Sequence, residues 1–271
     1  MVRSLWTAAT GMIAQQTNVD TIANNLANVN TTGYKTEVAE FKSLLYQTLQ
    51  TRTTSANGEE KPIGAQVGLG VRNSAITSIF KDGNVYESEN EFAFALNGKG
   101  FFAVQGDDDT TYYTRNGNFG IAIDSNGMSL TDSDGRQVLD TNGKPITFNK
   151  NLVSSDITVN SEGEFFYPDT NGQPKSLGIT IGIYQFNNPA GLDKVGNSLF
   201  QETEASGDVI NESKNNKITR TRLMKGYLEG SNVQLADEMV NLIVAQRAYE
   251  MNSKAIQASD EMLQQATQLR R

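Results

Sequence analysis

Two seven-residue repeats, one at each end of the chain, constrain its fold more than any other feature of the sequence. The N-terminal repeat consists of Leu5, Met12, Val19, Ile22, Leu26 and Val29. The C-terminal repeat consists of Leu228, Leu235, Met239, Leu242, Tyr249, Ile256 and Leu263. A repeat of this length keeps one face of a helix apolar and is typical of helices that pack against other helices. We therefore predict an α+β protein in which terminal helices form a coiled-coil domain and serve as an assembly seam.

The ends of these helices follow from the residues around them. Asn30 and Gly33 stop the N-terminal helix, since glycine readily adopts the left-handed conformation that closes a helix. Between Ser231 and Arg271 the sequence contains neither proline nor glycine, which predicts one long C-terminal helix. A second amphipathic stretch follows the first helix and carries its apolar residues on one face, at Val38, Phe41, Leu44, Leu45 and Leu49. A polar segment rich in Thr, Ser, Asn and Gly then predicts an exposed loop at residues 51–62.

Four asparagines lie within these helical repeats: Asn24, Asn25, Asn28 and Asn252. An amide that faces a helix interface fixes the register of the helices, because a misaligned asparagine loses its hydrogen bonds. The other interpretation is that they are ordinary surface residues. We retain the register role as an expectation.

The central part of the chain alternates apolar and polar residues with a period of two. Examples are Phe92 to Leu96, Phe119 to Ile123 and Leu177 to Ile183. Turn signals separate these stretches at positions 82–83, 97–98, 116–117, 126–127, 134–135, 142–143 and 171–172. This density of hairpin signals predicts an inserted antiparallel β domain. The expected domains are residues 1–67, an N-terminal helix with an extended segment; 68–210, the β core; and 211–271, the C-terminal helix.

Charge and composition exclude several partners. The net charge is −8 and the sequence pI is about 4.7, with no basic stripe of the kind that binds nucleic acid. No apolar stretch is long enough to cross a bilayer, so no membrane insertion is expected. Thr7, Thr10 and Gly11 interrupt the N-terminus, which is not a secretory signal peptide.

The sequence contains no histidine and no cysteine, which removes thiol chemistry, imidazole acid–base chemistry and the common zinc sites. Asp107 to Asp109 and Asp132 to Gly135 fail the calcium-loop pattern, because an EF-hand that began at Asp132 would have Arg136 at position five. Acidic loop turns explain these runs better. We expect no catalytic residue, cofactor or metal.

Two motifs leave weaker alternatives. The run from Gly98 to Ala103 matches a dinucleotide fingerprint, but an apolar strand follows its glycines where that site needs a helix. The pairs Glu162 with Glu164 and Asp156 with Asp169 could serve a glycosidase, although any acidic β protein offers such pairs.

Several long motifs resemble those of one family, the bacterial flagellar rod and hook proteins. The segment from Ala23 to Lys35 resembles their shared N-terminal signature, and Val240 to Asn252 is similar to their C-terminal motif. Gly98 to Phe102 and Tyr113 to Gly117 are similar to their core-domain pattern. The opening from Arg3 to Met12 resembles the distal rod subunit in particular.

The resemblance implies a non-enzymatic subunit that polymerises helically into a rigid hollow shaft, with helices inside and β domains outside, and transmits torque to the hook. It implies export through the flagellar type III apparatus without a cleaved signal, and a location in the basal body across the periplasm. The implied partners are further copies of the chain, proximal rod proteins, the hook protein and the P-ring and L-ring bushing. Tyr46 to Val71 resembles the stretch that distinguishes distal rod from hook proteins. A proximal rod subunit and, more remotely, a secreted carbohydrate-active β protein are the alternatives.

Overall fold

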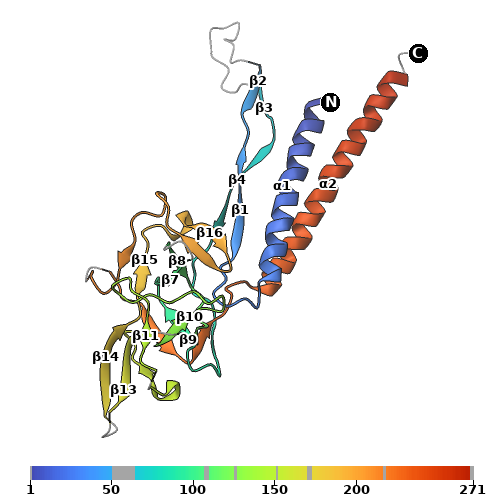
Figure 1. Ribbon diagram of the computed structural model, residues 1–271. Coiled ribbons are helices and arrows are strands. Elements are labelled where there is room, and N and C mark those ends of the chain that lie inside the picture. Colours follow the sequence, from blue (N-terminus) through green and yellow to red (C-terminus); the bar gives the residue numbers. More distant parts are fainter. Residues whose placement is uncertain are drawn as a thin grey trace. The chain divides into compact units, whose positions relative to one another are not determined.

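The computed structural model describes residues 2–50, 65–106, 110–124, 127–150, 152–169, 173–215 and 218–268. The predicted α+β class is confirmed, with a helix at each end and antiparallel strands between them (Figure 1). The chain forms two compact units. The first contains Met1–Ala27, Glu37–Ser78 and Gln234–Arg271, and the second contains Asn28–Thr36 and Ile79–Val233. The expected loop over residues 51–62, the acidic run 107–109, the turn at 171–172 and the first residue of the turn at 126–127 lie outside the described residues.

Two antiparallel helices lie side by side in the first unit, α1 (Val2–Ala27) and α2 (Leu235–Gln268) (Figure 1). Helix α2 carries Asp237 and Glu238 in its first turn, where negative charge favours a helix start. Leu228 fits the seven-residue interval but does not belong to the helix. It lies buried in a strand of the second unit, because Gly226, at a φ of +78°, and Gly230 bound a short extended segment there.

The predicted amphipathic stretch after α1 is wrong if read as a helix, because it forms two strands of a long hairpin. Strand β1 (Glu37–Ser43) pairs with β4 (Val71–Ser78), and β2 (Tyr46–Gln50) pairs with β3 (Ala65–Gly68). The backbone bonds from Leu44 N–H to Gly70 O and from Leu69 N–H to Leu45 O continue the pairing between the two ladders. The apolar spacing is compatible with an amphipathic helix and with a strand. This segment forms strands because partner strands are available for it to pair with.

The second unit is built from short antiparallel strands. Its strands are β5 (Val85–Glu87), β6 (Phe94–Asn97), β7 (Phe101–Gln105), β8 (Thr111–Thr114), β9 (Gly120–Asp124), β10 (Gly127–Thr131), β11 (Thr147–Phe148), β12 (Thr158–Val159), β13 (Glu164–Pro168), β14 (Pro174–Thr180), β15 (Ile183–Gln185), β16 (Asp193–Gly196), β17 (Leu199–Gln201), β18 (Ile210–Asn211), β19 (Arg222–Lys225) and β20 (Tyr227–Glu229). Short 3-10 turns lie at Ser154–Asp156 and Pro189–Gly191. The largest sheet has the order β16-β17-β8-β7-β15-β18, and four smaller sheets have the orders β11-β10-β9, β12-β13-β14, β19-β6 and β20-β5.

The core of the second unit lies on both faces of β7. Successive strand residues point to opposite faces, so Phe102 joins one apolar cluster and Phe101 joins the other. Phe102 contacts Phe119 edge to face at 5.1 Å between ring centroids, and Phe101 contacts Phe186 in the same way at 5.6 Å. Two aromatic cores on one central strand make this unit a complete folded body.

The glycine turns confirm the reading of the central segment. Gly135 and Gly143 adopt φ values of +83° and +74° in turns that close short β bridges. Gly98 has a φ of +137°, and β7 follows Gly100 directly. A strand in that place offers no helix N-terminus to hold a pyrophosphate, so the dinucleotide interpretation does not apply.

Candidate functional site

The two helices of the first unit contact each other at small residues in two places, and further small side chains are buried along both helices. Ala8 and Ala14 of α1 are buried, as are Ala245 and Ser259 of α2. The hydroxyl oxygens of Ser4 and Ser259 lie 3.3 Å apart. Gly11 packs against Asn252, whose Nδ2 would lie 2.8 Å from a Cβ at that glycine. Small residues at these two places allow the backbones of the two helices to approach closely.

The predicted seam residues are distributed over several environments. Ile22 is buried. Seven of them are partly buried: Leu5, Met12, Val19, Leu26, Leu242, Ile256 and Leu263. Leu235, Met239 and Tyr249 are exposed on α2, and Val29 belongs to the second unit.

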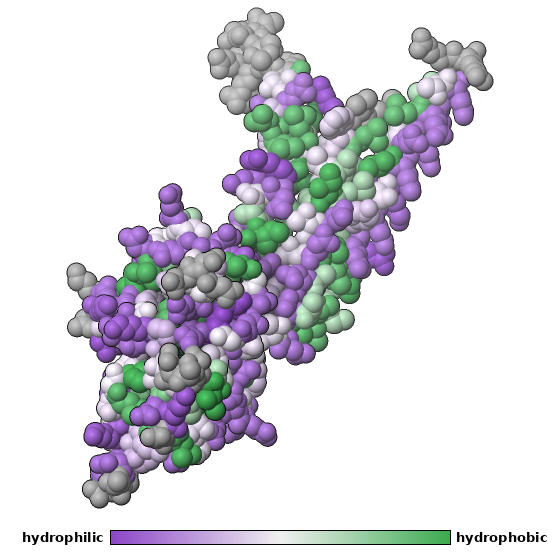
Figure 2. Space-filling view, in the orientation of Figure 1, coloured by the Kyte–Doolittle hydropathy of each residue, from purple (hydrophilic) through white to green (hydrophobic). Residues whose placement is uncertain are grey.

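A further set of large apolar side chains is exposed on the same helices, and the seven-residue repeat did not identify it. Trp6 and Ile13 on α1 are 69% and 65% exposed. On α2 the exposed row consists of Val240, Ile243, Val244 and Met251. We call these six residues the outer apolar surface. Figure 2 shows hydrophobic side chains at the surface along the helices. Their spacing of three, four and seven residues is a second helical row that a search for one period passes over.

The predicted register asparagines make different contacts. Asn25 is buried: its Nδ2 donates to Glu37 O at 2.8 Å, and its Oδ1 accepts from Glu37 N–H at 2.9 Å. Asn24 is exposed, and its Nδ2 lies 3.4 Å from a side-chain oxygen of Glu37. In the second unit, Asn28 accepts a hydrogen bond from the Thr31 hydroxyl at 3.0 Å. Asn252 lies against Gly11 between the helices.

Glu238 lies close to Asn25 at the start of α2. Burial raises the pKa of the Glu238 carboxyl, a hydrogen bond with Asn25 lowers that pKa, and the neighbouring charge of Asp237 raises it. The side chain of Asn25 therefore meets three elements of the first unit: its own helix α1, strand β1 and helix α2.

A buried ion network lies in the second unit where the chain enters and leaves it. Lys35 Nζ donates to Glu229 Oε1 at 2.6 Å and to Lys81 O at 2.7 Å. Arg115 donates to Gly100 O and to Asp82, each within 2.9 Å. Among the described residues Arg115 Nε and Glu229 Oε2 have no hydrogen-bond partner, but they face each other at 3.6 Å. Sequence reasoning missed this network, whose charged members lie far apart in the chain.

The charged groups of the network balance one another within the protein interior. Burial and the positive charge of Arg115 lower the pKa of Lys35, and the carboxylate of Glu229 opposes them. Glu229 Oε1 also accepts from Gly83 N–H at 2.9 Å. Asn232 adds a neutral link, since its Oδ1 accepts from the backbone N–H and the hydroxyl of Thr36 at 2.7 Å. These bonds tie residues 33–36 to residues 229–232.

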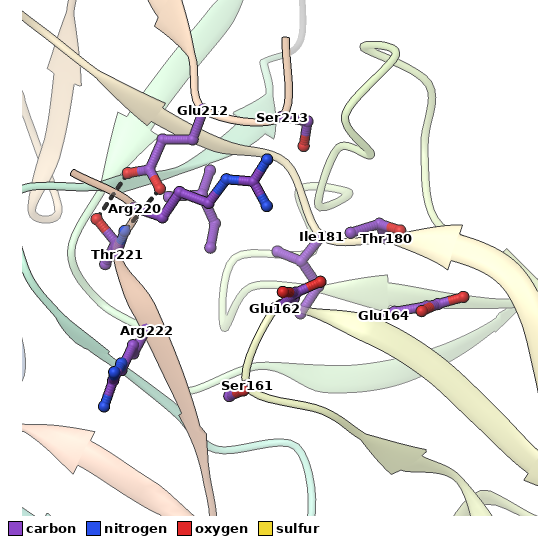
Figure 3. Close-up of a pocket in the computed structure, with 11 residues that line it drawn as sticks. Ser161, Glu162, Glu164, Thr180, Ile181, Glu212, Ser213, Arg220, Thr221 and Arg222 are labelled. Carbon is purple, nitrogen blue, oxygen red and sulfur yellow. Dashed lines mark hydrogen bonds between the residues drawn. The ribbon is translucent and has the colours of Figure 1, made fainter. Parts of the chain in front are cut away.

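An open groove of about 620 Å³ is also present in the second unit (Figure 3). Glu162 and Glu164, one of the carboxylate pairs considered from the sequence, line it together with Arg220 and Arg222. Glu164 is engaged by the hydroxyl of Ser176. At the groove, Glu212 accepts from Thr221 N–H at 2.7 Å and from its hydroxyl at 2.6 Å. No group of three potential metal-ligating side chains was found among the described residues. The carboxylates serve turns and strands, and this arrangement does not favour glycoside hydrolysis.

Comparison with known proteins defines the class first. Three family models match, described as "Flagella basal body rod protein" at residues 5–35, "Flagellar hook protein FlgE/F/G D1 domain" at 95–167 and "Flagellar basal body rod FlgEFG protein C-terminal" at 224–269. These matches cover both helices and part of the β unit. They place the chain among the structural proteins of the bacterial flagellum.

Full-length relatives are more specific. The chain is 46% identical to "Flagellar basal-body rod protein FlgG" of Borreliella burgdorferi, with 100% of both chains covered. It is 41% identical to the protein of the same name in Buchnera aphidicola, over 99% of this chain and 100% of the relative. It is also 41% identical to the protein of the same name in Agrobacterium fabrum, over 96% of this chain and 97% of the relative. The chain belongs to the flagellar basal-body rod protein family and is a structural subunit of that rod.

Proposed function

We propose that this protein is the distal rod subunit of the flagellum and polymerises helically into a hollow shaft that carries torque to the hook. Similarity over the whole chain to relatives named FlgG supports the distal assignment. The single structural observation that supports polymerisation is the row of large apolar side chains exposed on the helix pair. Small residues lie at two contacts between α1 and α2, Ser4 with Ser259 and Gly11 with Asn252, while the large residues of the outer apolar surface remain exposed.

Exposed apolar side chains in such a row favour association, because burying them removes hydrocarbon surface from water at about 25 cal/mol per Å². Their helical spacing suits packing against helices of further copies, as in a coiled coil. In this proposal the predicted seam residues line both the internal contact and the contacts between copies. A shaft built in this way resists twisting, because every subunit is held by several helices.

The proposed partners are further copies of this chain, the proximal rod proteins, the hook protein, the P-ring and L-ring bushing and the flagellar type III export apparatus. The chain is proposed to cross the periplasm as part of the rod, to be exported without a cleaved signal and to act without catalysis. Neither helix in the described part of the chain is long and apolar enough to span a membrane. The acidic net charge of −8 gives no support to a nucleic-acid partner.

The outer apolar surface can be tested with one charge. Val244→Asp places a carboxylate in the exposed row, and Gln246→Asp adds the same charge two positions away at an exposed polar site. We expect Val244→Asp to abolish rod incorporation and motility, with the β unit still folded by near-ultraviolet circular dichroism. Gln246→Asp should support normal rods. Equal motility in both strains would contradict the proposed surface.

The position in the rod is tested by deleting the gene and imaging the cell envelope by electron cryotomography. Shafts that stop short of the outer membrane, without a hook, would support the distal assignment. Loss of the shaft nearer the inner membrane would support the alternative of a proximal rod subunit. Intact flagella would reject both.

A further inference from the structure

The hairpin of β1–β4 is attached to helix α1 by polar contacts at two places. The first is the buried pair of hydrogen bonds between Asn25 and the backbone of Glu37, at the start of β1. The second is at Thr10, whose Oγ1 accepts from Val71 N–H at 3.4 Å while its hydroxyl donates to Thr7 O at 2.8 Å. Thr10 thus uses its hydroxyl both for its own helix and for the hairpin.

Gly70 makes the second contact possible. A Cβ at this position would lie 2.1 Å from Thr10 Oγ1, and the φ of +115° is one that other residues rarely adopt. Any larger residue would push the hairpin away from the helix and strain the backbone. Glycine at position 70 therefore allows the hairpin to approach the Thr10 hydroxyl of α1 closely.

The two contacts are matched in length. Thr10 and Asn25 are fifteen residues apart on α1, which is about 22 Å at the rise of an α-helix. Glu37 pairs with Ser78 at one end of the β1–β4 ladder and Ser43 pairs with Val71 at the other, a span of about 20 Å for an extended strand. Both strands lie against α1 over this span. The hairpin is consequently held at its two ends along the helix.

Beyond Gly70 the hairpin continues as β2 and β3, which carry exposed apolar side chains at Tyr46, Leu49 and Val67. Leu45 and Leu69, which lie next to these strands, are exposed as well. The polar contact with α1 that lies nearest to this continuation is the one between Thr10 and Val71. A ribbon of only two strands is weak by itself and takes its orientation from what it packs against.

We propose that Asn25 and Thr10 are positioning residues that fix the β1–β4 hairpin along α1 and so set how β2 and β3 are presented to the neighbouring copy in the rod. This inference rests on the proposed polymerisation. Its observable core lies within a single chain: loss of either side chain frees one end of the hairpin. Loss of Asn25 also removes its hydrogen bond with Glu238 of α2, whereas loss of the Thr10 hydroxyl leaves that bond in place.

Two variants with matched controls test it in the purified full chain. Asn25→Ala removes the buried amide, and its control Gln16→Ala removes an exposed amide elsewhere on α1. Thr10→Val removes the hydroxyl at nearly constant shape, and its control Thr7→Val removes an exposed hydroxyl that bonds to Arg3 O within the helix. Thr10→Ser restores the hydroxyl. Hydrogen exchange is followed at the amides of Glu37 and Val71, with α1 and α2 amides as internal references.

We expect at least tenfold faster exchange at Glu37 in Asn25→Ala and at Val71 in Thr10→Val. Exchange in the helices should stay unchanged outside the first turn of α2, where Asn25→Ala also removes a hydrogen bond with Glu238. Both control variants should match the wild type, and Thr10→Ser should restore the slow rate. Equal exchange in all variants would overturn the proposal. Faster exchange throughout α1 and α2 would also overturn it, since it would mean a general loss of stability rather than a loss of position.

The second readout is assembly in cells that require the wild-type protein for rod formation. Asn25→Ala and Thr10→Val should yield at least tenfold fewer complete basal bodies than their controls. Normal assembly despite a freed hairpin would overturn the positioning role but leave the rod function intact. If cells without the gene build normal rods, the proposed function itself fails, and the two failures are thereby distinguished.

Discussion

The two units of this chain bury opposite kinds of residue. The β unit encloses its largest side chains, and Phe94, Phe102 and Phe119 are at most 1% exposed. On its helices the helical unit buries mostly small or polar side chains, with Ile22 as a large exception, and leaves large apolar residues such as Trp6 and Met251 exposed. The β unit therefore has the interior of a protein that is finished by itself. The helical unit leaves large apolar side chains exposed, and the proposed assembly with further copies would cover them.

The largest expected effect on stability comes from truncating one buried aromatic residue of the β unit, compared with truncating one exposed aromatic residue of the helical unit. Phe102→Ala should lower the free energy of unfolding of the β unit by about 3–5 kcal/mol, because it empties a fully buried site. Trp6→Ala should change the stability of the isolated chain by less than about 0.5 kcal/mol, because the side chain is exposed, while it lowers rod incorporation. Denaturant unfolding and basal-body counts measure the two effects. A large loss of stability for Trp6→Ala would contradict the comparison.

A second variant tests whether the β unit depends on its buried charges. Glu229→Gln keeps the shape of the side chain but leaves Lys35 and Arg115 without their shared carboxylate, which should cost about 3 kcal/mol. Glu87→Gln, on the exposed strand β5, is the control and should stay within about 0.5 kcal/mol. Urea unfolding monitored by tyrosine fluorescence gives both values, and equal midpoints would mean that the network is energetically neutral.

Substituting one glycine in each unit by alanine tests how far the surrounding atoms can move. A Cβ at Gly33 would lie 2.7 Å from backbone atoms of Arg115 and Asn116, at a φ of +70°, so Gly33→Ala should cost about 1–3 kcal/mol. A Cβ at Gly11 would meet the end of the Asn252 side chain, which can move, and alanine favours the helix. Gly11→Ala should therefore change stability by less than about 1 kcal/mol. Thermal unfolding of both variants decides, and a larger loss for Gly11→Ala would reverse the comparison.

The smallest expected effect concerns pH and the helical unit. Because burial raises the pKa of Glu238 above its ordinary value, the folded chain binds this proton more readily than the unfolded chain. The contribution of Glu238 to stability is then more favourable at low pH and is lost as the pH rises through the folded pKa. Glu238→Gln should be more stable than the wild type at pH 7, and this difference should disappear below the ordinary carboxyl pKa of about 4. Melting curves of the helices across that range test the sign.

Much of the fold could be predicted from local patterns. The seven-residue repeats locate both helices, and the glycine turns locate the short strands, because both signals lie within a few neighbouring residues. The segment from Val38 to Leu49 could not be assigned in the same way, since its strand partners begin beyond residue 64. Leu228 matched the helical interval only by coincidence of spacing.

The candidate site was less accessible for the same reason. The bond from Lys35 to Glu229 joins residues 194 positions apart, and no local pattern marks either partner. The outer apolar surface does have a local signal, the row from Val240 to Met251, but a search for a single seven-residue period conceals it. Asn25 was singled out by its residue type, whereas its backbone partner at Glu37 depends on the hairpin.

The hydrogen bond from Gly33 N–H to Glu229 O, at 2.8 Å, brings the entry and exit of the β unit together. A domain whose two chain connections lie side by side is attached to the rest of the protein at one place. It can be lengthened, shortened or exchanged between the same two points without altering the separation of the flanking segments. The β unit is therefore an insert with a single place of attachment, and its content can vary while the two ends of the flanking chain stay together.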